Sequence, residues 1–300
     1  MKIILIYFLL LVTLSARTQE NTTHGRLIRY EDFQSRYIPP RNVDVWLPEG
    51  YTPTRKYNVL YMHDGQNVYD LKTSNFGGWK VDSVLTLLMA KKEVAPYIVV
   101  AVWNNPDNRV GEYIPQAIFE HLSDSFKREL KTLKGEVVSD NYLSFLVKEL
   151  KPFIDKTYST QKNKNSTSIM GSSMGGLISL YALMKYPKIF GSAACLSTHW
   201  PTLGKEKEFA VTLNYLHKKL SVGNKQKIYF DHGTQQIDKQ YAYYQEKVDS
   251  LMQAKGFNFD QWTSKVFENA AHNETYWATR LHIPLKFILQ NPVMDSAEYK

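Results

Sequence analysis

The stretch SIMGSSMGG, residues 168–176, decides the fold of this chain. It reads as a short apolar strand, then the pattern Gly-x-Ser-x-Gly, then the start of a helix that stops before Pro187. A strand, a sharp turn and a helix in this order are typical of a nucleophile elbow, which holds a serine on a strained turn. The glycines are needed because such a turn leaves little room for side chains beside the serine. The stretch therefore predicts that Ser173 is the nucleophile of a serine hydrolase.

Apolar runs alternate with helical patterns from about Val59 to the end of the chain. Strands are expected at residues 42–48, 57–62, 95–103, 168–172, 191–196, 227–231 and 259–267. Helices are expected at residues 141–158, 176–187, 237–254 and 273–289, with a kink or break at Pro152. This alternation predicts an α/β protein with a mostly parallel sheet and helices on both faces. The first residues after position 26 are expected to add antiparallel edge strands.

The N-terminus has the pattern of an export signal. Lys2 precedes the apolar run of residues 3–12, and small residues follow at Thr13, Ser15 and Ala16. We expect residues 1–16 to be a signal peptide and the protein to be periplasmic or secreted, with an uncleaved anchor as the alternative. The single cysteine, Cys195, excludes a disulfide within the chain and is expected to be a buried apolar residue.

The rest of the chain shows no linker, so residues 17–300 are expected to form one domain. Residues 104–140 are polar and poorly periodic, which indicates an insertion that covers the sheet as a lid or substrate-binding segment. The formal charge of +8 is dispersed over many lysines, without an arginine-rich stripe. This pattern predicts no nucleic-acid partner, and no stable membrane insertion is expected once the signal is removed.

A nucleophilic serine needs a histidine base and a carboxylate that orients it, and after an elbow the order is serine, acid, histidine. His272 lies in a loop between the last expected strand and the last helix, and we predict that it is the base. Asp238 follows the strand at 227–231 and is the favoured acid, although Asp238 could also cap a helix. Asp231, at the end of that strand, is the alternative acid.

An oxyanion hole needs two backbone N–H donors. The amide of Met174 is one candidate, and the amide of Gly65 or Gln66, in the loop after the 57–62 strand, is the other. The neighbours His63-Asp64 and Asp231-His232 lack the spacing of metal ligands, so neither a metal nor another cofactor is expected.

These residues together resemble the "putative esterase" family of α/β-hydrolases, which contains enterochelin-esterase-like proteins and the feruloyl and acetyl-xylan esterases of carbohydrate esterase family one. The matching pieces are YMHDGQN at 61–67, Arg109 with EYIP at 112–115, GSSMGG at 171–176, DHGT at 231–234, and AHNE at 271–274 with Trp277 and Arg280. They span about residues 27–290. The resemblance implies an α/β-hydrolase fold and a serine esterase with the triad named above. Relatives often have an acidic residue soon after the Gly-Thr pair, where this chain has Gln235 and Gln236, so the resemblance leaves the acid open.

The resulting hypothesis is an exported serine carboxylic-ester hydrolase that acts on acetyl or feruloyl esters of polysaccharide. The candidates for the substrate pocket are Arg109, Glu112, Tyr113 and Trp200, each of which could instead be a structural residue of its loop. A siderophore esterase, an acyltransferase on the same fold and a non-catalytic binding protein are the alternatives. The sequence does not decide the acyl group, the alcohol or the oligomeric state.

Overall fold

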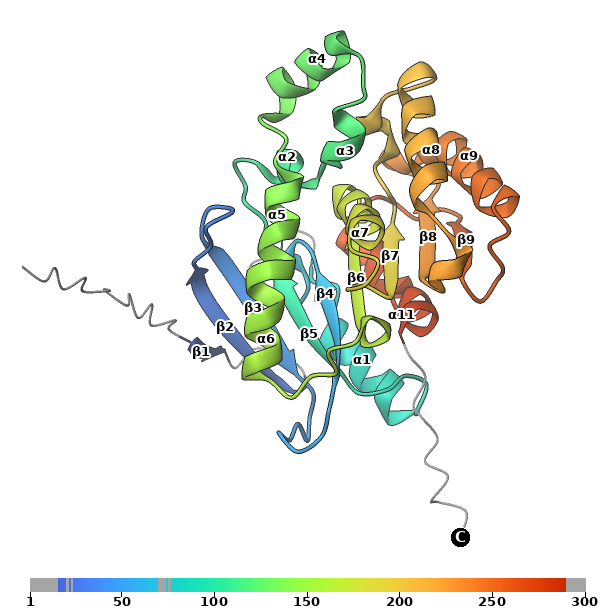
Figure 1. Cartoon of the computed structure of the whole chain (residues 1–300). Helices are drawn as coiled ribbons and strands as arrows, with labels where there is room; N and C mark the ends of the chain where they lie inside the picture. Colours follow the sequence, from blue (N-terminus) through green and yellow to red (C-terminus); the bar gives the residue numbers. More distant parts are fainter. Residues whose placement is uncertain (1–15, 20–21, 23, 70–73, 75–76, 290–300) are drawn as a thin grey trace, which may run out of the picture.

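A computed structural model of the chain describes residues 16–19, 22, 24–69, 74 and 77–289 (Figure 1). Within these residues, nine strands form a single sheet in the order β1-β2-β3-β5-β4-β6-β7-β8-β9. The predicted signal peptide lies outside the described residues, except for Ala16, which begins β1. None of the helices in the described ranges combines the length and hydropathy that a bilayer crossing requires.

The sheet changes from antiparallel to parallel within the first half of the chain. β1 (Ala16–Gln19), β2 (Arg26–Phe33) and β3 (Arg41–Leu47) are antiparallel to their neighbours, and β3 joins the rest through β5 (Tyr97–Val102). The remaining pairs are all parallel and involve β4 (Asn58–Met62), β6 (Thr167–Ser172), β7 (Ser192–Leu196), β8 (Lys227–Gly233) and β9 (Trp262–Phe267). The predicted parallel sheet with antiparallel edge strands is therefore confirmed.

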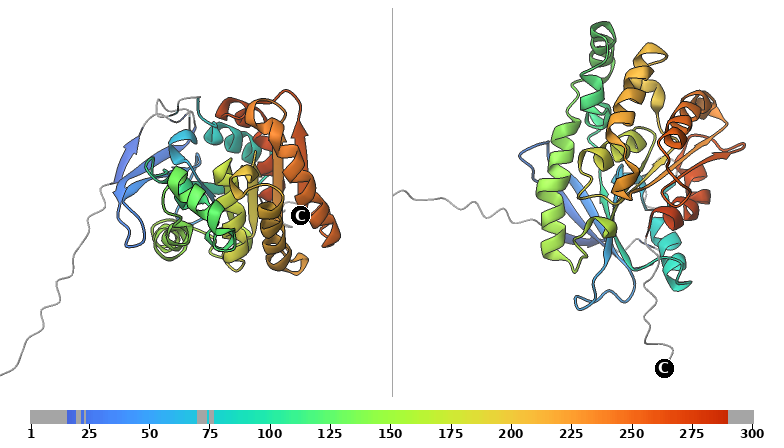
Figure 2. Two further views of the ribbon diagram at one scale, coloured as in Figure 1. Left: turned by 90° about the horizontal axis from the view of Figure 1, so that it is seen from above. Right: turned by 45° about the vertical axis from the view of Figure 1, so that its right-hand side comes forward.

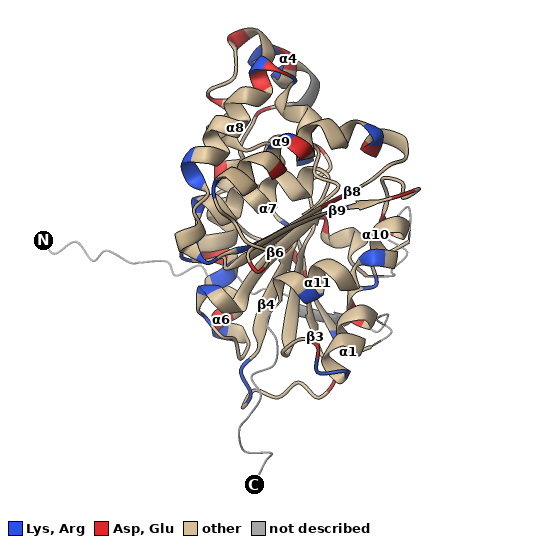
Figure 3. Cartoon of the chain, turned by 90° about the vertical axis from the view of Figure 1, so that its right-hand side faces the viewer, with Lys and Arg blue, Asp and Glu red and all other residues tan. Residues whose placement is uncertain are grey.

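Helices cover both faces of the sheet, as Figures 2 and 3 show. One face packs against α5 (Ser139–Phe145), α6 (Lys151–Thr157), α7 (Met174–Lys185), α8 (Lys207–Lys219) and α9 (Tyr241–Ala254). The other face packs against α1 (Val81–Ala90), α10 (Glu274–Arg280) and α11 (His282–Ile288). Alternate residues of a strand point to opposite faces of the sheet. In β4, Tyr61 therefore packs in the core on the side of α7, and Leu60 packs in the core on the side of α1.

Two expected helices are interrupted at prolines. Between α5 and α6, residues 146–150 form the π-helical turn η2 just before Pro152, where the missing N–H prevents a regular helical bond. The expected closing helix is two helices, α10 and α11, that meet at Leu281, because Pro284 also lacks the N–H that a continuous helix would use. The single helix predicted for residues 273–289 was therefore wrong.

Residues 104–140 contain α2 (Arg109–Tyr113), α3 (Gln116–Phe119) and α4 (Asp124–Lys134), and α4 lies near α8 at the top of Figure 1. Ser123 caps α4, and its hydroxyl donates a hydrogen bond of 2.6 Å to Glu208 of α8. Leu130 of α4 is buried, whereas most of its neighbours are exposed. This segment thus has helical structure that its weak periodicity did not indicate.

Candidate active site

Ser173 lies on a strained turn between β6 and α7. Its backbone has φ 58° and ψ −122°, a conformation that a residue with a side chain adopts only when its surroundings enforce it. The amide of Ser173 donates to the carbonyl of Leu196, at 2.8 Å, which ties the turn to the end of β7. A Cβ added to Gly171 would lie 2.8 Å from the backbone of Gly175, so strand and helix approach more closely than any side chain permits. This geometry is that of a nucleophile elbow.

His272 and Asp238 form a hydrogen-bonded pair. The distance between His272 Nδ1 and Asp238 Oδ1 is 2.6 Å, and the Asp238 side chain is fully buried while that of His272 is 17% exposed. The other carboxylate oxygen of Asp238 accepts from the Ser197 hydroxyl and from the amide of Gly233, each at 2.7 Å. Burial raises the pKa of Asp238, but these hydrogen bonds and the nearby imidazole lower it below its ordinary value. Asp238 therefore stays ionised and holds Nδ1 of His272 as a donor.

Asp231 does not reach His272, because it is committed to another partner. Both of its carboxylate oxygens accept from the Arg280 guanidinium, at 3.0 and 3.1 Å, and the two side chains are buried together. The amide of Ser197 and the hydroxyl of Tyr229 also donate to it. Of the two carboxylates that the sequence left open, the structure thus pairs Asp238 with the histidine.

Ser197 connects these two carboxylate pairs. Its hydroxyl donates to Asp238 and accepts from Trp277 Nε1 at 3.0 Å and from Arg280 at 3.2 Å. Its backbone φ of 40° is also in the left-handed region. The indole of Trp277 packs edge-on against the His272 ring, with centroids 5.0 Å apart. The imidazole is thus fixed by its hydrogen bond and by an aromatic neighbour.

Tyr241 lies beside both Ser173 and His272. Ser173 is close enough to its hydroxyl to lower the pKa of Tyr241, and the Tyr241 ring packs edge-on against that of His272, with centroids 5.8 Å apart. The two residues that the sequence predicted as nucleophile and base are therefore neighbours of one side chain, on the same side of the molecule.

The loop after β4 lies against the elbow. A Cβ added to Gly175 would be 3.4 Å from the Asp64 carboxylate and 3.5 Å from His63. Gly65 begins the short helix η1 (Gly65–Asn67), and Met174 begins α7. The first amides of a helix have no acceptor within that helix, so they remain suited to bind an oxyanion. The loop thus brings Gly65 and Gln66 to the same side of the sheet as Met174.

Arg109 holds this loop in place. Its guanidinium donates two hydrogen bonds to Asp64, at 2.6 and 2.7 Å, and Asn104 adds a third at 2.6 Å. Burial raises the pKa of Asp64, but Arg109 and Asn104 lower it below its ordinary value. The Arg109 side chain is 28% exposed, so it retains a solvent-facing part.

Three residues predicted for the substrate pocket are buried instead. Glu112 is 1% exposed and accepts two hydrogen bonds from Arg41, at 2.7 and 2.8 Å. Tyr113 is 0% exposed, and Trp200 is 1% exposed, with its indole N–H bonded to Gln245 at 3.0 Å. Each of the three side chains is enclosed by protein atoms, and this burial disagrees with the prediction that they contact the substrate. Their second interpretation, as structural residues, agrees with it.

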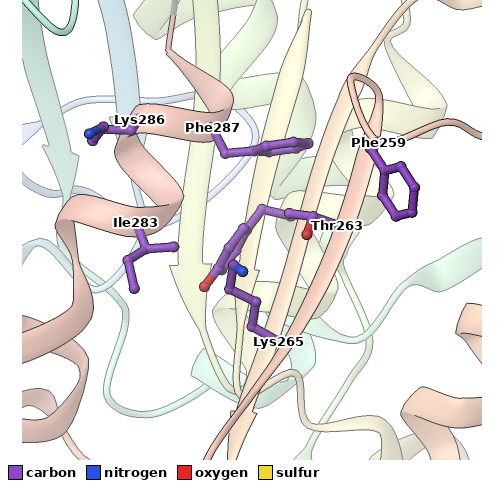
Figure 4. A pocket seen from close by; sticks show the side chains of 7 residues that line it. Phe259, Thr263, Lys265, Ile283, Lys286 and Phe287 are labelled. Atoms are coloured by element: carbon purple, nitrogen blue, oxygen red, sulfur yellow. The ribbon is translucent and has the colours of Figure 1, made fainter.

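A shallow groove of about 350 Å³ lies elsewhere, between β8, β9 and α11 (Figure 4). It is lined by Tyr229, Phe259, Thr263, Lys265, Ile283, Lys286 and Phe287. None of these residues belongs to the predicted site, so we base no function on this groove. In the described part of the chain, no three His, Cys, Asp or Glu side chains gather to share a metal ion.

Sequence reasoning missed Tyr241 and Ser197. Tyr241 is one of 20 tyrosines, and Ser197 follows an apolar strand without any motif of its own. The positive φ of Ser197 and the hydrogen bonds of both residues appear only after β6, β7 and β8 are placed side by side. A sequence signal for either residue is absent.

Comparisons with known proteins place this geometry in context. The sequence model of the family described as "Putative esterase" matches residues 38–288. An endo-1,4-beta-xylanase/feruloyl esterase of Xylanibacter ruminicola is 24% identical over 188 residues, which cover 60% of this chain and 22% of that protein.

Two solved structures share the fold. The feruloyl esterase module of Clostridium thermocellum, complexed with sinapinate, aligns with a TM-score of 0.64 and 18% identity, over 93% of this chain and 95% of that one. The ferric enterobactin esterase of Salmonella typhimurium aligns with a TM-score of 0.62 and 16% identity, over 87% of this chain and 57% of that one. The predicted α/β-hydrolase fold is confirmed.

Proposed function

The chain belongs to the "Putative esterase" family and is a carboxylic ester hydrolase, and on this premise we propose that it is a serine esterase that uses Ser173, His272 and Asp238. The observation that carries the proposal is the 2.6 Å contact between His272 and Asp238, in a chain that holds Ser173 on a strained elbow. A buried carboxylate that fixes the tautomer of an imidazole makes the other ring nitrogen, Nε2, a base.

The chemistry follows from these positions. Nε2 of His272 accepts the Ser173 proton while Oγ attacks the carbonyl carbon of the ester. The amides of Met174 and of Gly65 or Gln66 bind the oxyanion that forms. The alcohol leaves with the proton from His272, and an acyl-enzyme remains on Ser173. Water, deprotonated by the same imidazole, then releases the acid.

We propose that the substrate is an acetyl or feruloyl ester of a polysaccharide. The xylanase/feruloyl esterase relative and the feruloyl esterase module support a substrate of this class. Arg109 is bonded to Asp64 beside Gly65 and keeps a solvent-exposed part, which supports a contact with the alcohol or acyl part. Such a substrate lies outside the cell, which agrees with our proposal that residues 1–16 export the protein to the periplasm or the medium.

The test compares the wild type with Ser173→Ala and with Ser168→Ala. Ser168 is a buried residue of β6, the strand that leads to Ser173; its hydroxyl accepts from Ser192, and it serves as the matched control. We expect Ser173→Ala to lose at least about 10³-fold in kcat on p-nitrophenyl acetate and methyl ferulate, and to resist labelling by a fluorophosphonate. Ser168→Ala should retain both. Turnover that survives in Ser173→Ala would refute the nucleophile assignment.

A second assay separates the substrate classes. Acetylated xylan, feruloylated oligosaccharide and enterobactin are offered in turn, with and without an added alcohol acceptor. Faster hydrolysis of enterobactin than of both polysaccharide esters would overturn the substrate proposal but not the triad. Transfer of the acyl group to the acceptor in place of water would identify an acyltransferase.

A further inference from the structure

Tyr241 is the first residue of α9, and it is almost completely buried. Its hydroxyl contacts two groups at the nucleophile: the Ser173 side chain and Nδ1 of His199. Its ring also packs against His272. The hydroxyl therefore lies near the attacking oxygen while the ring lies against the imidazole of His272, a position that neither Asp238 nor the oxyanion amides occupy.

The His199 partner is fixed relative to the nucleophile. The amide of His199 donates to the carbonyl of Ser173, at 3.1 Å, so the two residues move together. The next residue, Trp200, is bonded to Gln245 of α9 at 3.0 Å, which holds the helix of Tyr241 against the same segment. The position of the Tyr241 hydroxyl is thus set by the backbone of the elbow itself.

The hydroxyl keeps its proton. Burial raises the pKa of Tyr241 far above its ordinary value, and the charge of Asp238 raises it further, while the hydrogen bond with Ser173 opposes this rise. A tyrosine in this state is a hydrogen-bond donor and not a base. When His199 carries its proton on Nδ1, it donates to the tyrosine oxygen, and the tyrosine O–H then points away from His199 toward Ser173.

We propose that Tyr241 is a further catalytic residue, whose hydroxyl donates a hydrogen bond to the alcohol oxygen of the ester as the carbon–oxygen bond breaks. This inference rests on the proposed serine esterase mechanism. The tetrahedral carbon formed by Ser173 carries Oγ, the oxyanion and the alcohol oxygen. The oxyanion faces the backbone amides, so the alcohol oxygen is on the side of His272 and Tyr241.

The step balances without a further reactant. The carbon–oxygen bond breaks and its electron pair stays on the alcohol oxygen. The proton that His272 took from Ser173 passes from Nε2 to that oxygen. Tyr241 keeps its own proton and stabilises the negative charge that develops before the proton arrives.

The proposal makes the effect of Tyr241 depend on the alcohol. Ethoxide and methoxide are strong bases and need stabilisation as they leave, whereas p-nitrophenolate is a weak base that leaves without it. Two pairs of esters keep the acyl group constant: ethyl and p-nitrophenyl acetate, and methyl and p-nitrophenyl ferulate. Within a pair, the two esters have the same acyl group and differ in how much the leaving oxygen needs a hydrogen-bond donor.

The experiment measures kcat/KM on both pairs for Tyr241→Phe, which keeps the ring against His272 and removes the hydroxyl. We expect a loss of about 10- to 100-fold on the alkyl esters, and of less than about threefold on the p-nitrophenyl esters. The matched control is Tyr244→Phe on the same helix, because the Tyr244 hydroxyl is buried and has no hydrogen-bond partner among the described residues. The control should leave both rates unchanged.

A second pair of variants tests the role of His199. His199→Asn retains an N–H donor close to the position of Nδ1 and should keep most of the activity on alkyl esters, whereas His199→Leu should show the selective loss. An equal loss on both members of each ester pair, or no loss in Tyr241→Phe, would overturn the inference. If the wild type itself shows no turnover that depends on Ser173, the proposed function fails, and this outcome is seen before any Tyr241 variant is made.

Discussion

Asp238→Asn changes one oxygen of the carboxylate to an amide nitrogen and tests the orientation of His272. In the structure, one oxygen of Asp238 accepts from His272 Nδ1 at 2.6 Å, and the other accepts from Ser197 and Gly233. Asparagine has a single acceptor oxygen. If that oxygen keeps the Ser197 and Gly233 donors, the NH₂ group faces Nδ1 and requires it to be an acceptor. The imidazole proton then sits on Nε2, and His272 can no longer take the proton of Ser173.

The expected loss follows from this change of tautomer. Removal of the orienting charge in a serine–histidine–aspartate triad reduces kcat by on the order of 10⁴-fold. This factor corresponds to about 5 kcal/mol of transition-state stabilisation. We expect Asp238→Asn to show a loss of this size for p-nitrophenyl acetate at saturating substrate. The fold should persist, because the amide has the shape of the carboxylate, and thermal unfolding by circular dichroism checks this.

Asp231→Asn is the companion variant, with the same atom exchange on the carboxylate that Arg280 holds. It leaves the Arg280 charge buried without a full partner, so we expect unfolding to become easier by about 3–5 kcal/mol. Activity per folded molecule should fall far less than in Asp238→Asn. If Asp238→Asn retained more than a tenth of kcat while Asp231→Asn lost about 10⁴-fold, the acid assignment would be wrong.

Three further outcomes are expected. Gly233→Ala should lower kcat at least about tenfold, because its Cβ would meet the Ala270 carbonyl at 2.1 Å and displace the loop of His272. Glu112→Gln should reduce the free energy of unfolding by about 3–5 kcal/mol, measured in urea, with KM unchanged. Burial lowers the pKa of His63 from 6.5 to about 3, so as the pH falls the imidazole is protonated in the unfolded chain before it is protonated in the folded one. The stability that the neutral imidazole contributes is present above pH 6.5 and is lost as the pH falls toward 3. Urea titrations should therefore show that the free energy of unfolding depends less on pH in His63→Gln.

Much of the sheet was predictable because β4, β5 and β7 are short, mostly apolar runs that are buried along their whole length. The sequence places β4 and β5 within a few residues of their observed ends. The start of β9 was less predictable, since Phe259 continues the apolar pattern. In the structure Phe259 is 89% exposed, and Asn258 turns the chain by accepting from the amides of Asp260 and Gln261. The alternation of polar and apolar residues does not reveal a turn that is made by hydrogen bonds to the side chain of Asn258.

A residue of the site was predictable where its motif lies in one segment of the chain. It was not predictable where its role depends on a side chain that is distant in the sequence. The elbow of Ser173 is local, since its glycines and its strand are contiguous. The choice between Asp231 and Asp238 depends on Arg280, which is 49 residues from Asp231 in the chain. Asp231 lies in β8 and Asp238 lies shortly after it, so their places along the chain do not separate them. The positions of His272 and Arg280 decide which aspartate pairs with the histidine. The burial of Glu112 similarly depends on Arg41, 71 residues earlier.

The parallel register explains why these distant groups meet at one place. Met62 pairs with Met170, Ser172 with Leu196, and Leu196 with Asp231, so the carboxyl ends of β4, β6, β7 and β8 lie in one row. In an open parallel sheet this edge collects the loops that bind ligands. The loop of Gly65 and Gln66, which we propose binds the oxyanion, follows β4. The elbow follows β6, Ser197 follows β7 and the loop of Asp238 follows β8. Ser197 then bonds to both Asp238 and Arg280, so the carboxylate that orients the base and the ion pair that stabilises the fold share one hydroxyl. Ser197→Ala should therefore reduce both activity and stability, whereas Asp238→Asn and Asp231→Asn each affect chiefly one of them.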